Sequence, residues 1–118
     1  MMKESLANIL KLLLISLFLL NFFGSAFISL INPESYFFGV RLGGMNASLY
    51  LLANGFVGVI IAYLLKKDVG IYLSVLYFGY NFTEVLITNL AFGFGPIISP
   101  FFTIGLVLSI ALLMIREK

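Results

Sequence analysis

Four long apolar runs fill almost the whole of this 118-residue chain, and they restrict its fold more than any other feature. Each run approaches or exceeds the roughly 20 mostly apolar residues that a helix needs to cross a bilayer. Only 10% of the residues are charged, which is too little polar surface for a soluble domain. The sequence therefore predicts an all-α integral membrane protein, with one domain over residues 1–118 and a bundle of four transmembrane helices at 12–31, 45–65, 69–91 and 97–115.

The basic residues predict the orientation of these helices. Arg41, between the first and second runs, is the only basic residue on its side of the membrane. The positive-inside rule places the side with more Lys and Arg in the cytoplasm. Both termini are therefore expected in the cytoplasm of a cell that carries the protein in its plasma membrane. The basic residues on the cytoplasmic side are Lys3, Lys11, Lys66, Lys67, Arg116 and Lys118.

The N-terminal segment has a second interpretation. Basic residues, an apolar stretch and then Gly24-Ser25-Ala26 are also typical of a cleaved signal peptide. The apolar residues continue to Ile31, however, and this full spanning length favours a retained helix.

The first outer loop, residues 32–44, is expected to be ordered. Asn32-Pro33-Glu34 is typical of a helix start, and Gly39 of a helix end. A short helix lying in the headgroup region, with Tyr36, Phe37 and Phe38 facing inward, is one prediction. An irregular loop with an aromatic belt is the other.

The third run carries a polar stripe at spacings of three and four residues. These spacings place side chains on one face of a helix, and that face should point into the bundle because polar groups facing lipid are costly. Asn21 in the first run and Asn54 in the second are expected at similar depth, where they can hydrogen-bond across helices. The stripe consists of Gly70, Ser74, Tyr77, Asn81, Glu84 and Thr88.

Glu84 is the one acid well inside an apolar run. It lies about 6 Å from the middle of its helix, too deep to reach the headgroups. It must be protonated, paired with a base or beside a water-filled cavity. Arg41 is the candidate ion-pair partner, and a proton or cationic ligand is the alternative. Ligand-binding candidates are Glu84, Asn81, Tyr77, Tyr80, Thr88, Asn54 and Asn21.

Several chemistries lack the residues they need. The chain has no Cys and no His, so the usual metal and haem ligands are missing, and no metal site or cofactor is expected. With a single intramembrane carboxylate and no evident nucleophile–base pair, no enzymatic activity is predicted. No basic cluster suggests nucleic acid.

Two families share features with the chain. Its size, four helices and single membrane Glu resemble the small multidrug resistance transporters. Their acid belongs to the first helix, so the resemblance assigns no role to Glu84. The stretch Gly24–Gly39, with Asn32-Pro33-Glu34, resembles DoxX-like four-helix membrane proteins over about one eighth of the chain.

The sequence favours a transporter-like or ligand- or proton-binding bundle that uses Glu84. An accessory or assembly subunit of a larger membrane complex is the alternative, in which the polar stripe docks a partner. Four helices leave little room for a complete pathway, so a homo-oligomer or larger complex within the lipid bilayer is expected in either case.

Overall fold

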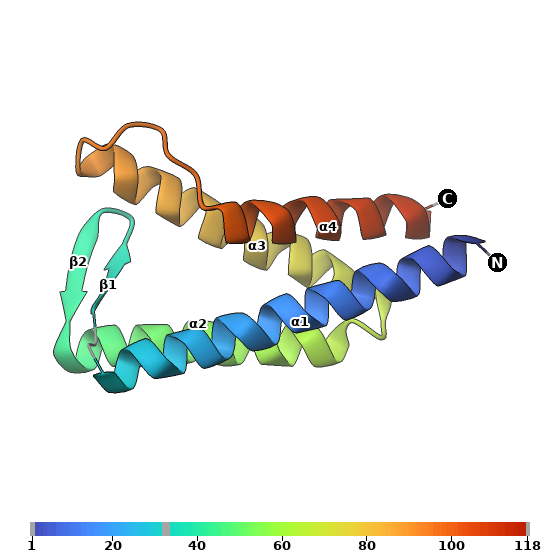
Figure 1. Cartoon of the computed structure of the whole chain (residues 1–118), viewed down its shortest axis with the longest axis horizontal. Coiled ribbons are helices and arrows are strands. Elements are labelled where there is room, and N and C mark those ends of the chain that lie inside the picture. Colours follow the sequence, from blue (N-terminus) through green and yellow to red (C-terminus); the bar gives the residue numbers. More distant parts are fainter. Residues whose placement is uncertain (1, 32–33, 118) are drawn as a thin grey trace.

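The computed structural model describes residues 2–31 and 34–117, with side chains for residues 4–31 and 35–115. The predicted all-helical fold with four helices is confirmed. In Figure 1, α1 and α2 form one layer and α3 and α4 the other, and the layers diverge toward a β-hairpin at one end. Both chain ends lie at the opposite end. The elements are α1 (Met2–Ile31), β1 (Glu34–Phe37), β2 (Val40–Gly43), α2 (Gly44–Leu64), α3 (Asp68–Ala91) and α4 (Pro100–Glu117).

Two helices differ in length from the apolar runs. Helix α1 begins at Met2 rather than at residue 12, because its first turns bury Ala7 and Leu10 beside Leu112 of α4. Helix α4 begins at Pro100 rather than at residue 97. Ser99 precedes it as a cap, with its Oγ accepting a 3.4 Å hydrogen bond from the N–H of Phe102.

The segment between α1 and α2 contains a β-hairpin, and the short helix predicted there is wrong for residues 34–43. Strands β1 and β2 pair antiparallel, with Phe37 opposite Val40. Phe38 and Gly39 connect them with φ values of 49° and 89°, and a two-residue type I′ turn requires positive φ at both positions. Gly39 therefore closes a hairpin instead of ending a helix. The predicted helix start at Asn32-Pro33 lies outside the described residues.

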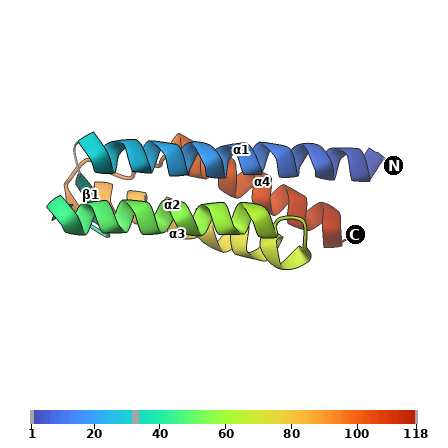
Figure 2. The same ribbon diagram turned by 90° about the horizontal axis from the view of Figure 1, so that it is seen from below.

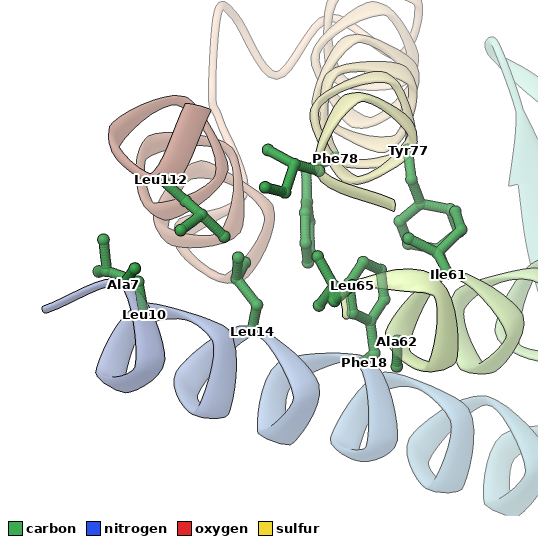
Figure 3. Close-up of a cluster of buried hydrophobic side chains, with 11 residues drawn as sticks. Ala7, Leu10, Leu14, Phe18, Ile61, Ala62, Leu65, Tyr77, Phe78 and Leu112 are labelled. Carbon is green, nitrogen blue, oxygen red and sulfur yellow. The ribbon is translucent and has the colours of Figure 1, made fainter. Parts of the chain in front are cut away.

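The main apolar core lies toward the end of the bundle that holds the two termini. Figure 3 shows it as a cluster of side chains that come from all four helices. Phe18 of α1 packs on Phe78 of α3 with ring centroids 4.8 Å apart, and both side chains are fully buried. This cluster closes the bundle at one end, so the divergence at the other end leaves room for the hairpin.

Helices α1 and α2 run antiparallel and close together, as Figures 1 and 2 show. A Cβ on Gly55 would lie 3.2 Å from the Cα of Phe22, and one on Gly58 would lie 3.1 Å from the ring of Phe18. Small residues at helix interfaces allow backbones to approach in this way. These contacts define which levels of α1 and α2 face each other.

Helix α4 packs on α3 through small residues. Ser109 and Ser74 share a 2.6 Å hydrogen bond between their hydroxyls, and both are fully buried. A Cβ on Gly105 would overlap the ring of Phe78. The small pair Gly105 and Ser109 thus faces α3.

Two of the described helices are long and apolar enough to cross a membrane, namely Glu4–Ile31 within α1 and Gly44–Leu64. Helix α4 is apolar over the shorter stretch Pro100–Ile115. Helix α3 is long enough, but the polar side chains of its stripe lower its mean hydropathy.

Candidate functional site

The polar stripe of α3 faces the bundle, as predicted. Its six members, Gly70, Ser74, Tyr77, Asn81, Glu84 and Thr88, are all buried. Among the described residues, every buried side-chain nitrogen or oxygen has a hydrogen-bond partner. The hydrogen-bonding groups of the stripe are therefore all paired within the chain. They form separate clusters.

The middle of the stripe joins three helices through one hydrogen-bond network. Asn21 donates a 2.6 Å bond to the hydroxyl of Tyr77, which donates a 2.9 Å bond to the backbone carbonyl of Asn54. Asn54 donates a 3.0 Å bond to Oδ1 of Asn81, and Asn81 donates back to the carbonyl of Tyr77 at 2.9 Å. These four predicted residues therefore bond to one another and act as cross-links between α1, α2 and α3.

The C-terminal part of the stripe, Glu84 and Thr88, contacts the hairpin instead. The carboxylate of Glu84 accepts hydrogen bonds from the hydroxyl of Thr88, at 2.7 Å, and from the backbone N–H of Phe38. The N–H of Gly39 donates a 3.0 Å bond to the oxygen of Thr88. Two successive N–H groups of the turn therefore bond to side chains of α3, one to the carboxylate and the other to the hydroxyl. Glu84 and Thr88 thus hold the hairpin tip against α3.

Aromatic rings reinforce this docking. Phe38 packs edge-on against Tyr80 of α3 with centroids 5.5 Å apart, and Phe37 packs against Tyr50 of α2 at 5.8 Å. On the other side of the hairpin, Tyr36 packs against Phe92 at 5.2 Å. The hairpin therefore bridges the two helix layers where they diverge, as Figure 1 shows.

A cavity of about 380 Å³ lies beside Glu84, between β1, the C-terminal part of α3 and the loop that follows α3. Glu84 is only 8% exposed, yet its side chain lines this space. The cavity combines one carboxylate with three aromatic side chains and several neutral polar groups. Its lining residues are Ser35, Tyr36, Glu84, Val85, Thr88, Asn89, Phe92 and Phe94.

The loop that closes this cavity has a defined geometry. Gly93 has φ 79°, and the N–H groups of Gly93 and Phe94 donate to the carbonyls of Leu90 and Asn89. This is the Schellman pattern that ends many helices. The side chain of Asn89 also donates a 2.9 Å bond to the carbonyl of Ile97. Phe92 and Phe94 are thereby held at the cavity.

Tyr80 lies outside the cavity, although the sequence predicts it in one ligand site with Glu84. Its hydroxyl shares a 2.9 Å hydrogen bond with that of Tyr50, and it lines a second, almost wholly apolar groove of about 380 Å³ between α2 and α3. Tyr77 and Asn54 also line this groove. Of the predicted site residues, only Glu84 and Thr88 line the cavity beside the acid.

Arg41 lies on β2, exposed, opposite Tyr36 in the hairpin register. Its ion pair with Glu84 stays a prediction, which a double-mutant cycle of Arg41→Gln and Glu84→Gln tests directly.

Sequence reasoning missed the cavity residues that come from outside α3. The sequence predicts Tyr36 either in a short interfacial helix or in an aromatic belt, and Phe92 and Phe94 follow the last polar position of the stripe. Asn89 next to Thr88 was the one local signal, because it extends the polar face of α3 toward the loop. Searches against protein-family models, curated proteins and solved structures returned no match for the chain.

Proposed function

We propose that the chain is a four-span membrane protein with both ends in the cytoplasm. Large apolar side chains are exposed on every helix, among them Leu30 at 85%, Leu76 at 68% and Val107 at 60%. Soluble monomers rarely expose contiguous apolar surface on this scale, whereas a lipid-facing bundle requires it. The two ends of the chain lie at the same end of the bundle, opposite the hairpin. An even number of spans places both ends on the same side of a membrane, so this arrangement fits four spans.

The apolar parts of α1 and α2 are long enough to span a bilayer. Lys11 and Ile31 are separated by 20 residues of one helix, which is about 30 Å. Residues from Gly44 to Lys66 cover a similar length along α2 and the turn after it. The hydrocarbon core of a bilayer is also about 30 Å thick. With Lys66 and Lys67 on the cytoplasmic side, the hairpin lies at the outer surface.

We further propose that the protein binds a small organic cation or a proton at Glu84. The observation that carries this proposal is an acid only 8% exposed that lines a cavity of about 380 Å³ beside the aromatic rings of Tyr36 and Phe92. Carboxylates and aromatic faces both attract cations, and more strongly where water is excluded. The cavity is also within the size range of small-ligand sites.

The cavity lining favours a cation over an anion. Glu84 is its only charged lining residue in the part of the chain that the structure describes. Thr88 and the N–H of Phe38 hold the carboxylate in one position, so little side-chain freedom is lost when a ligand binds. The proposal assigns no catalytic role to any residue.

A quaternary ammonium probe tests this proposal. Benzyltrimethylammonium is titrated into the purified full chain in detergent, with binding measured by calorimetry and benzyl alcohol as an uncharged control ligand. Glu84→Gln should weaken binding at least about tenfold, or about 1.4 kcal/mol. Glu4→Gln is the matched control, because Glu4 is an exposed acid on α1. Equal binding by wild type and Glu84→Gln, or equal affinity for benzyl alcohol, would refute cation binding at Glu84.

A second candidate function rests on the apolar groove between α2 and α3. It is lined by Val57, Leu73 and Leu76 together with Tyr50 and Tyr80. A helix of a larger membrane complex, or of a second copy, fits such a surface, and the chain would then be an accessory subunit. Light scattering of the purified protein separates the cases: a stable monomer that binds the ammonium probe supports the ligand-binding role.

A further inference from the structure

A groove of about 610 Å³ lies between α1 and the end of α2, at the opposite end of the bundle from the Glu84 cavity. Its floor is apolar and its polar residues gather toward one end. The apolar lining residues are Ile15, Leu19, Val59, Ala62 and Leu65, and the others are Asn8, Lys11, Tyr63 and Lys66.

The two lysines of the groove lie at the same level. Phe18 and Gly58 face each other across the antiparallel helices. Lys11 is seven residues before Phe18, about 10 Å along α1. Helix α2 continues for six residues after Gly58, about 9 Å in the same direction, and Lys66 follows two residues after its end at Leu64. Lys11 of α1 and Lys66 after α2 therefore line the same end of the groove, one from each side.

Lys66 is exposed and contacts a neighbouring aromatic ring. Its Nζ lies over the ring of Tyr63, 3.9 Å from the centroid, in a cation–π contact. Lys11 is half-buried rather than free in solvent. In the part of the chain that the structure describes, no acidic side chain lines this groove. The polar end of the groove is therefore positively charged, and the rest of the groove is apolar.

We infer that this groove binds an anionic phospholipid of the inner leaflet, with the phosphate between Lys11 and Lys66. One acyl chain then lies along Ile15, Leu19 and Val59, toward the middle of the bilayer. The inference rests on the proposed membrane orientation, which places both lysines at the cytoplasmic surface, and it goes beyond the role proposed for Glu84. Basic pockets between helices on this side of a membrane match lipid headgroups in charge and depth.

The apolar floor distinguishes a lipid from a free anion. Inorganic phosphate gains only the lysine contacts, whereas a phospholipid also packs an acyl chain against Leu19 and Val59. Each lysine near a membrane surface contributes about 1 kcal/mol toward anionic lipid, which is about fivefold in affinity. Two lysines should therefore favour phosphatidylglycerol over phosphatidylcholine by roughly 25-fold.

Native mass spectrometry of the full chain tests this inference. The detergent-solubilised protein is mixed with equal amounts of phosphatidylglycerol and phosphatidylcholine that carry the same acyl chains, and the ratio of the two bound lipids is measured. Wild type should retain mainly phosphatidylglycerol. The double variant Lys11→Gln/Lys66→Gln should lose this preference. Lys67→Gln is the control, because Lys67 is an exposed neighbour that does not line the groove.

Two further arms make the result decisive. The double variant Lys11→Arg/Lys66→Arg keeps both charges and should keep the lipid preference, which separates loss of charge from loss of folding. Excess inorganic phosphate should leave the bound lipid in place. Equal retention of both lipids by wild type, an equal loss in Lys67→Gln, or displacement by inorganic phosphate would overturn the inference. None of these variants alters the Glu84 cavity, so failure here is distinct from failure of cation binding.

Discussion

The hydroxyl of Thr88 donates a 2.7 Å hydrogen bond to Oε2 of Glu84, one turn earlier on α3, and accepts a 3.0 Å bond from the N–H of Gly39. This single hydroxyl links the buried acid to a turn 49 residues earlier in the chain. Because the N–H of Phe38 also donates to the carboxylate, the hairpin and the acid position each other. Stability of the hairpin and binding at Glu84 should therefore change together.

Replacing Thr88 with Val should release the hairpin tip without changing the shape of α3. The N–H of Gly39 would lose its partner in a partly buried setting, and the buried Glu84 would lose a donor, which together cost about 1 to 3 kcal/mol. Thr83→Val is the matched control, because the exposed hydroxyl of Thr83 bonds only to the carbonyl of Gly79 within α3. Thermal unfolding in detergent measures the difference. Equal effects of the two substitutions would contradict the proposed link.

Gly39→Ala should undock the hairpin for two reasons. Its φ of 89° disfavours a side chain, and a Cβ there would lie 2.7 Å from the Cβ of Ala91. Gly93→Ala carries a similar backbone penalty at φ 79° but has open space around it. A positive φ costs about 1 to 2 kcal/mol, so Gly39→Ala should be the more destabilising. Hydrogen exchange over residues 34–43 should rise in Gly39→Ala alone; unchanged exchange there would show that the hairpin tolerates the contact.

Tyr77→Phe should weaken the network that joins three helices. Removing the hydroxyl leaves the amide of Asn21 without its acceptor and removes the bond to the carbonyl of Asn54. The expected loss of stability is about 1 to 3 kcal/mol. Tyr63→Phe should be nearly neutral, because the ring that contacts Lys66 remains. A neutral Tyr77→Phe would mean that water or lipid groups replace the lost bonds.

The packing of α4 on α3 depends on Gly105. Gly105→Ala would drive a methyl group into the ring of Phe78, and overpacking of this kind costs about 1 to 3 kcal/mol. Gly79→Ala meets nothing closer than Leu106 at 3.9 Å and should stabilise α3 by up to about 1 kcal/mol. Thermal unfolding of the two variants should thus shift in opposite directions. A shift of the same sign in both would show that α4 packs differently in the membrane.

The absence of cysteine allows a direct test of the proposed topology. Val40→Cys, at an exposed position of the hairpin, should react with a membrane-impermeant maleimide in intact cells. Lys67→Cys, in the turn between α2 and α3, should react only after the cells are permeabilised. The reverse pattern would invert the orientation, and labelling of both in intact cells would exclude four spans with cytoplasmic ends.

Local patterns in the sequence were sufficient to predict the four helices and the buried face of α3. Helical periodicity depends on neighbours three and four residues apart, so Ser74, Tyr77, Asn81 and Glu84 could be assigned to one face from their spacing alone. The sequence predicts that this face is buried because exposing polar groups to lipid is costly.

The site itself was decided by contacts between distant segments. The turn at Phe38-Gly39 suits either the end of a helix or a hairpin, and only its docking on Thr88 and Ala91 selects the hairpin. The cavity beside Glu84 exists because the two helix layers diverge above a core at the other end, and because Tyr36 approaches Phe92 across 56 residues of chain. Spacing along the sequence determines the face of a helix, whereas the register between elements depends on side-chain packing that only the folded chain defines.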